Sequence, residues 1–169
     1  MHSLVVTIDD VLAGTRRGVD LAETIRNYLR DAYALWGADY LLLGGDTGLI
    51  PTRYCRNTFY PTGSFTEIPV DLYYGGLDGN WNGDGDAIFG EEYRSSADQG
   101  DDVDFDAEIT VGRATVNTVG EAESFVDKVL AYEIPVETDW QRRALFASEV
   151  LFPLGWKQGE PLQFDGAAL

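Results

Sequence analysis

The sequence predicts an α/β protein in which strands of a layered, mostly parallel sheet alternate with helices. Strand-like and helix-like apolar patterns follow one another through most of the chain. The strand-like runs are short and continuous, as in parallel strands buried on both faces. Hydrophobic residues make up 44% of the 169 residues, which is enough to build a core for one domain and the start of a second.

The first half of the chain predicts a strand, a helix and a second strand. Residues 3–8, SLVVTI, are a short apolar run typical of a buried strand. A helix is expected over residues 20–36, where apolar residues recur every three or four positions and Asp20 and Glu23 have the spacing of a capping box. Residues 38–46, ADYLLLGGD, then predict a central parallel strand.

The second half predicts three more strands and one more helix. Residues 69–77, PVDLYYGGL, are expected to form a strand that leads into an acidic loop, and residues 107–114, AEITVGRA, a further strand. An amphipathic helix follows from a capping box at Thr118 and Glu121. Its inward face is predicted to comprise Ala122, Phe125, Val126, Val129 and Leu130. Residues 143–151, RALFASEVL, begin one more strand.

The charge balance limits the partners of this protein. There are 29 acidic and 12 basic residues, giving a formal net charge of -17, so cations are favoured as partners, whereas nucleic acid and anionic membranes are poor ones. No apolar run approaches the roughly 18 residues of a membrane span. The N-terminal sequence has no signal-peptide pattern.

The negative charge is concentrated between Asp78 and Asp106. This stretch contains ten acidic residues and one base, Arg94. Like charges at this density repel one another unless a cation neutralises them. A solvated acidic loop is the simpler interpretation, but apolar residues such as Trp81 and Phe89 within the stretch favour a folded one.

Residues 80–91, NWNGDGDAIFGE, have the ligand spacing of an EF-hand calcium loop. Side chains with oxygen atoms occupy positions 1, 3, 5 and 7, a glycine occupies position 6, and an acid occupies position 12. The predicted ligands are Asn80, Asn82, Asp84, Asp86 and Glu91, with Asp78 just before the loop as a further carboxylate. The preceding residues are strand-like rather than helical, so we expect a Ca²⁺ loop inserted between strands, with an Asx-rich polar turn as the alternative.

The chain contains one cysteine, Cys55, and one histidine, His2. A cysteine becomes a nucleophile when a histidine activates it, but a histidine at the end of the chain is a poor general base. A single cysteine also excludes an internal disulfide framework. From the residues alone, Cys55 is therefore predicted to be structural, and no nucleophile is evident.

Three segments together resemble the gingipain-type cysteine peptidases. Residues 20–54 contain Gly-Asp-x-x-x-Ile-Pro-Thr-Arg, residues 70–91 contain Asp-Leu-Tyr-Tyr and the Asp/Asn/Gly loop, and residues 109–133 contain Val-Gly-Arg followed by the capped helix. The resemblance extends from about Val5 to Ala147. Both the motifs and their order are specific to that family.

The resemblance implies a caspase-like fold of two side-by-side subdomains, with the catalytic His and Cys on the second. Residues 1–136 would form the first, noncatalytic subdomain without its first strand, and residues 137–169 would begin the catalytic one. The chain would then be a fragment of a secreted prokaryotic cysteine endopeptidase that is stabilised by calcium and works outside the cell or at its surface. Its signal peptide, nucleophile and base would lie outside this chain, which alone would be inactive. Expected partners are a protein or peptide substrate and the remainder of the catalytic domain.

Two acidic residues near the C-terminus carry over from the resemblance. Glu149 matches a glutamate that supports the catalytic His, and Asp165 falls where arginine-specific members place an acid in the substrate pocket. An alternative function is a noncatalytic calcium-dependent binding or adhesion module, or an inactive homologue. Dockerin-like modules carry two such loops on helices, whereas this chain has one between predicted strands.

Overall fold

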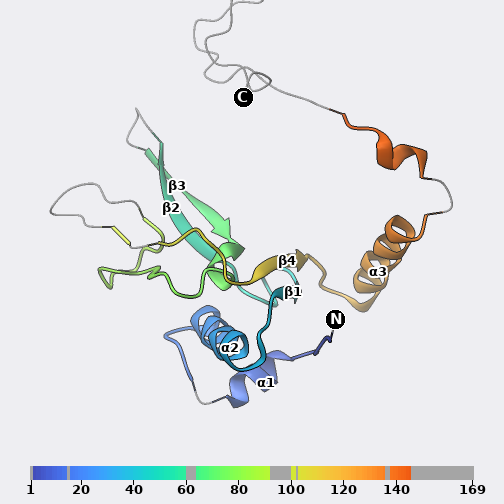
Figure 1. Ribbon diagram of the computed structural model, residues 1–169. Helices are drawn as coiled ribbons and strands as arrows, with labels where there is room; N and C mark the ends of the chain where they lie inside the picture. Colours follow the sequence, from blue (N-terminus) through green and yellow to red (C-terminus); the bar gives the residue numbers. More distant parts are fainter. Residues whose placement is uncertain are drawn as a thin grey trace, which may run out of the picture. The chain divides into compact units, whose positions relative to one another are not determined.

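The computed structural model describes residues 2–14, 16–59, 64–91, 100–101, 103–135 and 138–145 (Figure 1). The elements in chain order are α1 (Ile8–Ala13), α2 (Leu21–Trp36), β1 (Tyr40–Gly44), β2 (Arg53–Phe59), β3 (Ser64–Val70), the 3-10 helix η1 (Asp71–Tyr74), β4 (Thr110–Ala114), α3 (Val119–Glu133) and the 3-10 helix η2 (Asp139–Arg142). The chain divides into two compact units, residues 1–127 and 128–169. The second unit contributes the C-terminal part of α3 and η2 to the described residues.

The N-terminal segment is a loop followed by α1, so the strand predicted for residues 3–8 is wrong. Thr7 and Asp10 close a capping box: the Thr7 hydroxyl accepts from the Asp10 amide, and the Asp10 carboxylate accepts from the Thr7 amide at 2.9 Å. This box starts a helix inside the predicted strand. Leu4 and Val5 are 71% and 91% exposed.

Helix α2 confirms the helix predicted for residues 20–36. Asp20 is its N-cap and accepts a hydrogen bond from the Glu23 amide at 2.8 Å. The Glu23 carboxylate completes the cap one residue earlier than expected, on the amide of Val19. Gly37 ends the helix with a φ of 65°, a left-handed conformation that glycine adopts without strain. The buried apolar residues of the helix are Ala22, Ile25, Leu29 and Ala32.

Strands β1 and β4 form a parallel pair, as the runs at residues 38–46 and 107–114 predicted. Their register runs from Tyr40 opposite Thr110 to Gly44 opposite Ala114. Leu43 of β1 belongs to the same buried cluster as the apolar face of α2. The described residues therefore have a mixed α/β architecture, in which helices accompany a parallel strand pair.

The strand predicted over residues 69–77 is wrong beyond Val70, where a β-hairpin ends and the 3-10 helix η1 begins. Strands β2 and β3 pair antiparallel, and β3 ends at Val70. The next four residues form η1, which buries both Tyr73 and Tyr74. A strand would place these two side chains on opposite faces, whereas a 3-10 turn lets both enter the core.

Arg113 of β4 joins three parts of the first unit. Its guanidinium forms two hydrogen bonds with Asp71 of η1, at 2.6 and 2.7 Å. It also donates to the carbonyls of Gly45 and Ile50, on the connection between β1 and β2. The Asp71 carboxylate accepts a further hydrogen bond from Thr52 at 3.0 Å. The parallel pair, η1 and the start of the hairpin are thus tied to one cation.

Helix α3 begins at the predicted capping box: the amide of Thr118 donates to the Glu121 carboxylate, and the amide of Glu121 donates to the Thr118 hydroxyl. None of its residues is buried among the described residues, so the inward-facing assignment of Val126 and Leu130 is not confirmed; they are 52% and 50% exposed. An amphipathic pattern decides which residues share a face but does not supply the layer that covers it. Of the strand predicted for residues 143–151, the described part, residues 143–145, is not strand; the rest lies outside the described residues.

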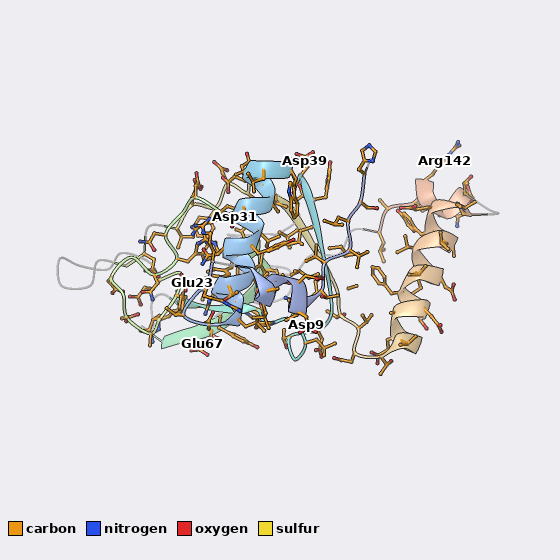
Figure 2. The ribbon with its side chains drawn as sticks, turned by 90° about the horizontal axis from the view of Figure 1, so that it is seen from below. Asp9, Glu23, Asp31, Asp39, Glu67 and Arg142 are labelled. Atoms are coloured by element: carbon orange, nitrogen blue, oxygen red, sulfur yellow. The ribbon has the colours of Figure 1, made fainter. Side chains whose placement is uncertain are left out.

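The acidic character is distributed over several elements of the first unit. Asp9 on α1, Asp39 before β1 and Glu67 on β3 are all exposed (Figure 2). Among the helices in the described ranges, none combines the length and the hydropathy needed to cross a bilayer.

The Arg113–Asp71 pair yields a stability prediction. The hydrogen bond from Arg113 lowers the pKa of Asp71 below its ordinary value of 3.8. Asp71→Asn should lower the free energy of unfolding at pH 7 by about 3 kcal/mol, because it leaves a buried guanidinium without its counter-ion. A group whose pKa falls on folding stabilises the protein above its unfolded pKa. The deficit should therefore be complete above about pH 5 and shrink as the pH falls through the folded pKa.

Urea unfolding of wild type and variant at several pH values measures this effect. Asp31→Asn is the matched control, because Asp31 pairs with Arg16 and both side chains are about half exposed. It should change stability little. Equal losses in the two variants would contradict the role assigned to the Arg113–Asp71 pair.

Candidate functional site

The acidic loop over residues 80–91 is held at its start by two arginines of α2. Arg26 donates to the carbonyl of Gly76 at 3.2 Å and to that of Gly79 at 2.8 Å. Arg30 donates to the carbonyl of Leu77 at 2.5 Å. Burial lowers the pKa of Arg26 to about 10, so it remains a cation at neutral pH. These contacts fix the chain entering the loop.

The end of the loop is attached to strand β2. Phe89 forms a parallel bridge with Cys55, and the amide of Arg56 donates to the Phe89 carbonyl at 3.1 Å. Gly90 has a φ of 63°, and a Cβ atom there would lie 2.6 Å from the Cys55 sulfur. Glycine is therefore required for the loop to approach β2 this closely.

One arginine of β2 connects this loop end to the rest of the first unit. The guanidinium of Arg53 lies 4.0 Å from the centre of the Phe89 ring and 4.5 Å from that of Tyr73. It also forms two hydrogen bonds with Asp20, the N-cap of α2, at 2.7 and 2.9 Å. The guanidinium of Arg53 therefore links the loop, the hairpin and the helix, because it stacks on aromatic rings and pairs with a carboxylate.

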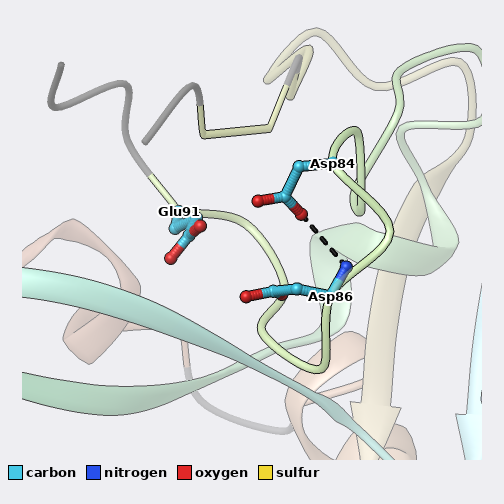
Figure 3. A group of neighbouring side chains, drawn as sticks. All are labelled: Asp84, Asp86 and Glu91. Atoms are coloured by element: carbon cyan, nitrogen blue, oxygen red, sulfur yellow. Dashed lines mark hydrogen bonds between the residues drawn. The ribbon is translucent and has the colours of Figure 1, made fainter. Parts of the chain in front are cut away.

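Three of the predicted ligands come together within the loop. One carboxylate oxygen from each of Asp84, Asp86 and Glu91 lies within 4.8 Å of the other two (Figure 3). Oxygens on opposite sides of a calcium ion are about 4.8 Å apart, twice the usual Ca–O distance of about 2.4 Å. Asp84 and Asp86 are exposed, whereas Glu91 is only 5% exposed. The group could therefore hold a cation between the solvent and the interior.

Local turns position these carboxylates. The amide of Asp86 donates to Asp84 at 3.1 Å, and the amide of Ile88 donates to Asp86 at 2.5 Å. Gly85 between the two aspartates has a φ of 78°, as the glycine at position 6 of such a loop should. Both hydrogen bonds are Asx turns, which suit the predicted calcium loop and its alternative, an Asx-rich polar turn, alike.

The two asparagines of the loop differ in their surroundings. The side-chain oxygen of Asn80 accepts from the Asn82 amide at 3.2 Å. The side-chain amide of Asn82 donates to the carbonyl of Asp86 at 2.9 Å, while its oxygen is buried and accepts no hydrogen bond from the described residues. A buried oxygen without a donor is costly unless a cation satisfies it. This oxygen fits the predicted ligand role of Asn82.

Asp78 stands apart from the three carboxylates. It is not a member of that group, and it lines a pocket with Gly79, Val103 and Asp104. Sequence reasoning missed a different acid, Asp101, as a part of the site. Its carboxylate accepts from the amide of Gly83 and, at 3.2 Å, from the amide of Glu91. Only its place in the acid-rich stretch pointed to this residue.

Cys55 lies in the core of the first unit, 8% exposed. Burial raises the pKa of its thiol to about 11, so the thiol is neutral at physiological pH. Its surroundings include the backbone of Gly90, and His2 is exposed on the N-terminal segment. A buried neutral thiol suits a structural role rather than nucleophilic chemistry. Glu149 and Asp165, the other predicted site residues, lie outside the described residues.

Comparison with known proteins places the chain in a family. A search among curated proteins found no match, and neither did a search among solved structures. A model described as peptidase family C25 matches residues 1–166, nearly the whole chain. This agrees with the order of motifs in residues 20–54, 70–91 and 109–133. The chain therefore belongs to peptidase family C25, the gingipain family of cysteine peptidases.

Proposed function

We propose that this chain is a noncatalytic, calcium-stabilised part of a secreted cysteine endopeptidase. Family membership indicates a cysteine peptidase that acts on protein substrates as the activity of the intact protein. The observation that carries the proposal for this chain is the convergence of Asp84, Asp86 and Glu91 in the same loop as the unsatisfied oxygen of Asn82.

Calcium is the cation that this group of residues suits best. The converging side chains offer only oxygen atoms, which favours a hard cation over zinc or copper. Calcium accepts six to eight oxygens at loose geometry, whereas Mg²⁺ requires a tight octahedron and keeps several waters. The proposed ligands are Asp84, Asp86, Glu91, Asn82 and Asn80, with Asp78 as a further candidate beside the loop.

In the intact enzyme a cysteine thiolate would attack the peptide carbonyl while a histidine transfers protons and backbone amides stabilise the oxyanion. We assign both side chains to residues outside this chain, because Cys55 is buried with a raised pKa and His2 lies on the exposed N-terminal segment. In this proposal residues 1–136 are the first subdomain of a caspase-like fold, and residues 137–169 begin the catalytic one. Glu149 would orient the histidine, and Asp165 would line the substrate pocket.

Calcium should stabilise this protein. Adding Ca²⁺ to the metal-free protein at about a hundredfold excess over Kd should raise the free energy of unfolding by about 2.7 kcal/mol. For a chain of this size, that corresponds to a rise in Tm of about 5–10 °C. Asp84→Asn combined with Asp86→Asn should abolish the rise, because two carboxylates of the site lose their charge. Scanning calorimetry with and without Ca²⁺ measures the effect.

The control for this experiment is Asp39→Asn combined with Asp106→Asn. It changes the net charge equally at two exposed acids outside the group. The control should keep the full calcium effect. A wild-type Tm that does not respond to millimolar Ca²⁺ would refute the metal site. A loss of response in both double variants would mean that Ca²⁺ acts by general charge screening and not at a specific site.

Cys55 should be inert in the folded chain. With a pKa of about 11, almost none of its thiol is thiolate at pH 8. Iodoacetamide should therefore label it only after unfolding in urea, and purified chain should not cleave Arg- or Lys-containing peptides. Mass spectrometry measures the labelling, and a peptide-cleavage assay measures the activity. Thiol-dependent cleavage that disappears in Cys55→Ala would overturn the noncatalytic assignment.

A substitution at Glu149 should lower the catalytic rate of the full-length protein without lowering its stability. In the full-length protein, Glu149→Gln keeps the size of the side chain but removes the charge that would support a protonated histidine. The kcat should fall about tenfold or more while the Tm stays nearly constant. Glu160→Gln, at another acid of the same segment, is the matched control. Unchanged kcat in Glu149→Gln would remove this residue from the active centre.

A further inference from the structure

The buried carboxylate of Glu91 lies close both to the proposed metal ligands Asp84 and Asp86 and to the guanidinium of Arg56. Its side chain is 4% exposed, and one of its oxygens lies within 4.8 Å of the carboxylates of Asp84 and Asp86. It also forms an ion pair with Arg56, whose guanidinium nitrogen lies 3.7 Å from a Glu91 oxygen. A buried carboxylate requires a positive partner, and here the chain itself provides one.

Arg56 belongs to strand β2, which is also joined to this loop through the backbone. The Arg56 amide donates to the Phe89 carbonyl at 3.1 Å, and the neighbouring Cys55 is bridged to Phe89. These contacts fix the backbone of residue 56 beside the end of the loop, and from there its guanidinium reaches Glu91. In the same loop, the side-chain oxygen of Asn82 is buried and accepts no hydrogen bond from the described residues, which leaves it available to a cation.

We propose that Arg56 is a built-in counter-ion of the metal site, which neutralises Glu91 in the metal-free protein and competes with the metal for that carboxylate. This inference rests on the proposed calcium site and describes its regulation. A metal bound to Asp84, Asp86 and Glu91 and the guanidinium of Arg56 repel each other across one shared carboxylate. The position of the β2–β3 hairpin therefore sets the metal affinity, and metal binding in turn loosens the link between hairpin and loop.

The affinity for Ca²⁺ tests this proposal. It is measured by isothermal titration calorimetry on the 169-residue chain after a chelator has removed bound metal and has itself been removed. Arg56→Gln removes the competing charge and should lower the Kd for Ca²⁺ about tenfold. Arg56→Lys keeps the charge and should stay within about twofold of wild type. Arg16→Gln removes the same charge from an exposed pair with Asp31 and should also leave the Kd within about twofold.

The outcomes separate this inference from the function on which it rests. A wild-type chain that binds no Ca²⁺ overturns the proposed site itself. A wild-type chain that binds Ca²⁺, with an unchanged or higher Kd in Arg56→Gln, overturns only the counter-ion role. An equal gain in Ca²⁺ affinity in Arg56→Gln and Arg16→Gln also overturns the counter-ion role, because net charge alone would then explain the effect.

A second measurement observes Arg56 in the wild-type chain and remains decisive if Arg56→Gln does not fold. Side-chain Nε–Hε signals of arginine are recorded by NMR during a Ca²⁺ titration, and the signal missing in Arg56→Lys identifies Arg56. Ca²⁺ should shift this signal in step with the backbone amides of residues 84–91, and leave the signal of Arg16 in place. Loop amides that move while the Arg56 signal does not would overturn the proposal.

Discussion

The buried guanidinium of Arg53 brings together four parts of the chain that are far apart in sequence. It forms two hydrogen bonds with Asp20 and a third, at 3.1 Å, with the hydroxyl of Tyr73, and it stacks on the rings of Tyr73 and Phe89. Burial by itself lowers the pKa of Arg53, but its hydrogen bonds to Asp20 and Tyr73 raise it more, so the group stays charged. A buried cation is tolerated only with its partners in place, and α2, β2, η1 and the acidic loop must therefore assemble together.

The acidic loop depends on arginines at both of its ends. Arg26 and Arg30 of α2 bind backbone carbonyls just before it, and Arg56 of β2 faces Glu91 where it ends. A protein with a formal charge of -17 thus uses a few of its cations to fix the most acidic part of its chain. A loop held in this way would lose little conformational freedom on binding the proposed metal, which would favour affinity.

Much of the first unit is held together by buried apolar and charge-paired residues. The described residues contain a buried core, a parallel strand pair and an oxygen-lined loop, while the chain's one thiol is neutral and enclosed. Arg113, which ties β4 to η1 and to the connection after β1, belongs to the Val-Gly-Arg motif by which the sequence resembles the family. That motif has a structural purpose in this chain, because it organises the first unit around one ion pair.

The sequence by itself determined the features that depend on neighbouring residues. These are the capped helices α2 and α3, the parallel strands β1 and β4, and a loop that brings Asp84, Asp86 and Glu91 together. The hairpin was not predicted, because the polar and aromatic residues of RYCRNTF and the following Pro-Thr-Gly are only a weak strand-and-turn signal. Only the tertiary structure decided that two adjacent tyrosines enter one core as a 3-10 turn, that Asp101 supports the loop, and that Arg56 faces Glu91. The contacts that hold the first unit together include residues far apart in sequence, 33 positions between Arg53 and Asp20 and 42 between Arg113 and Asp71, and no local pattern records them.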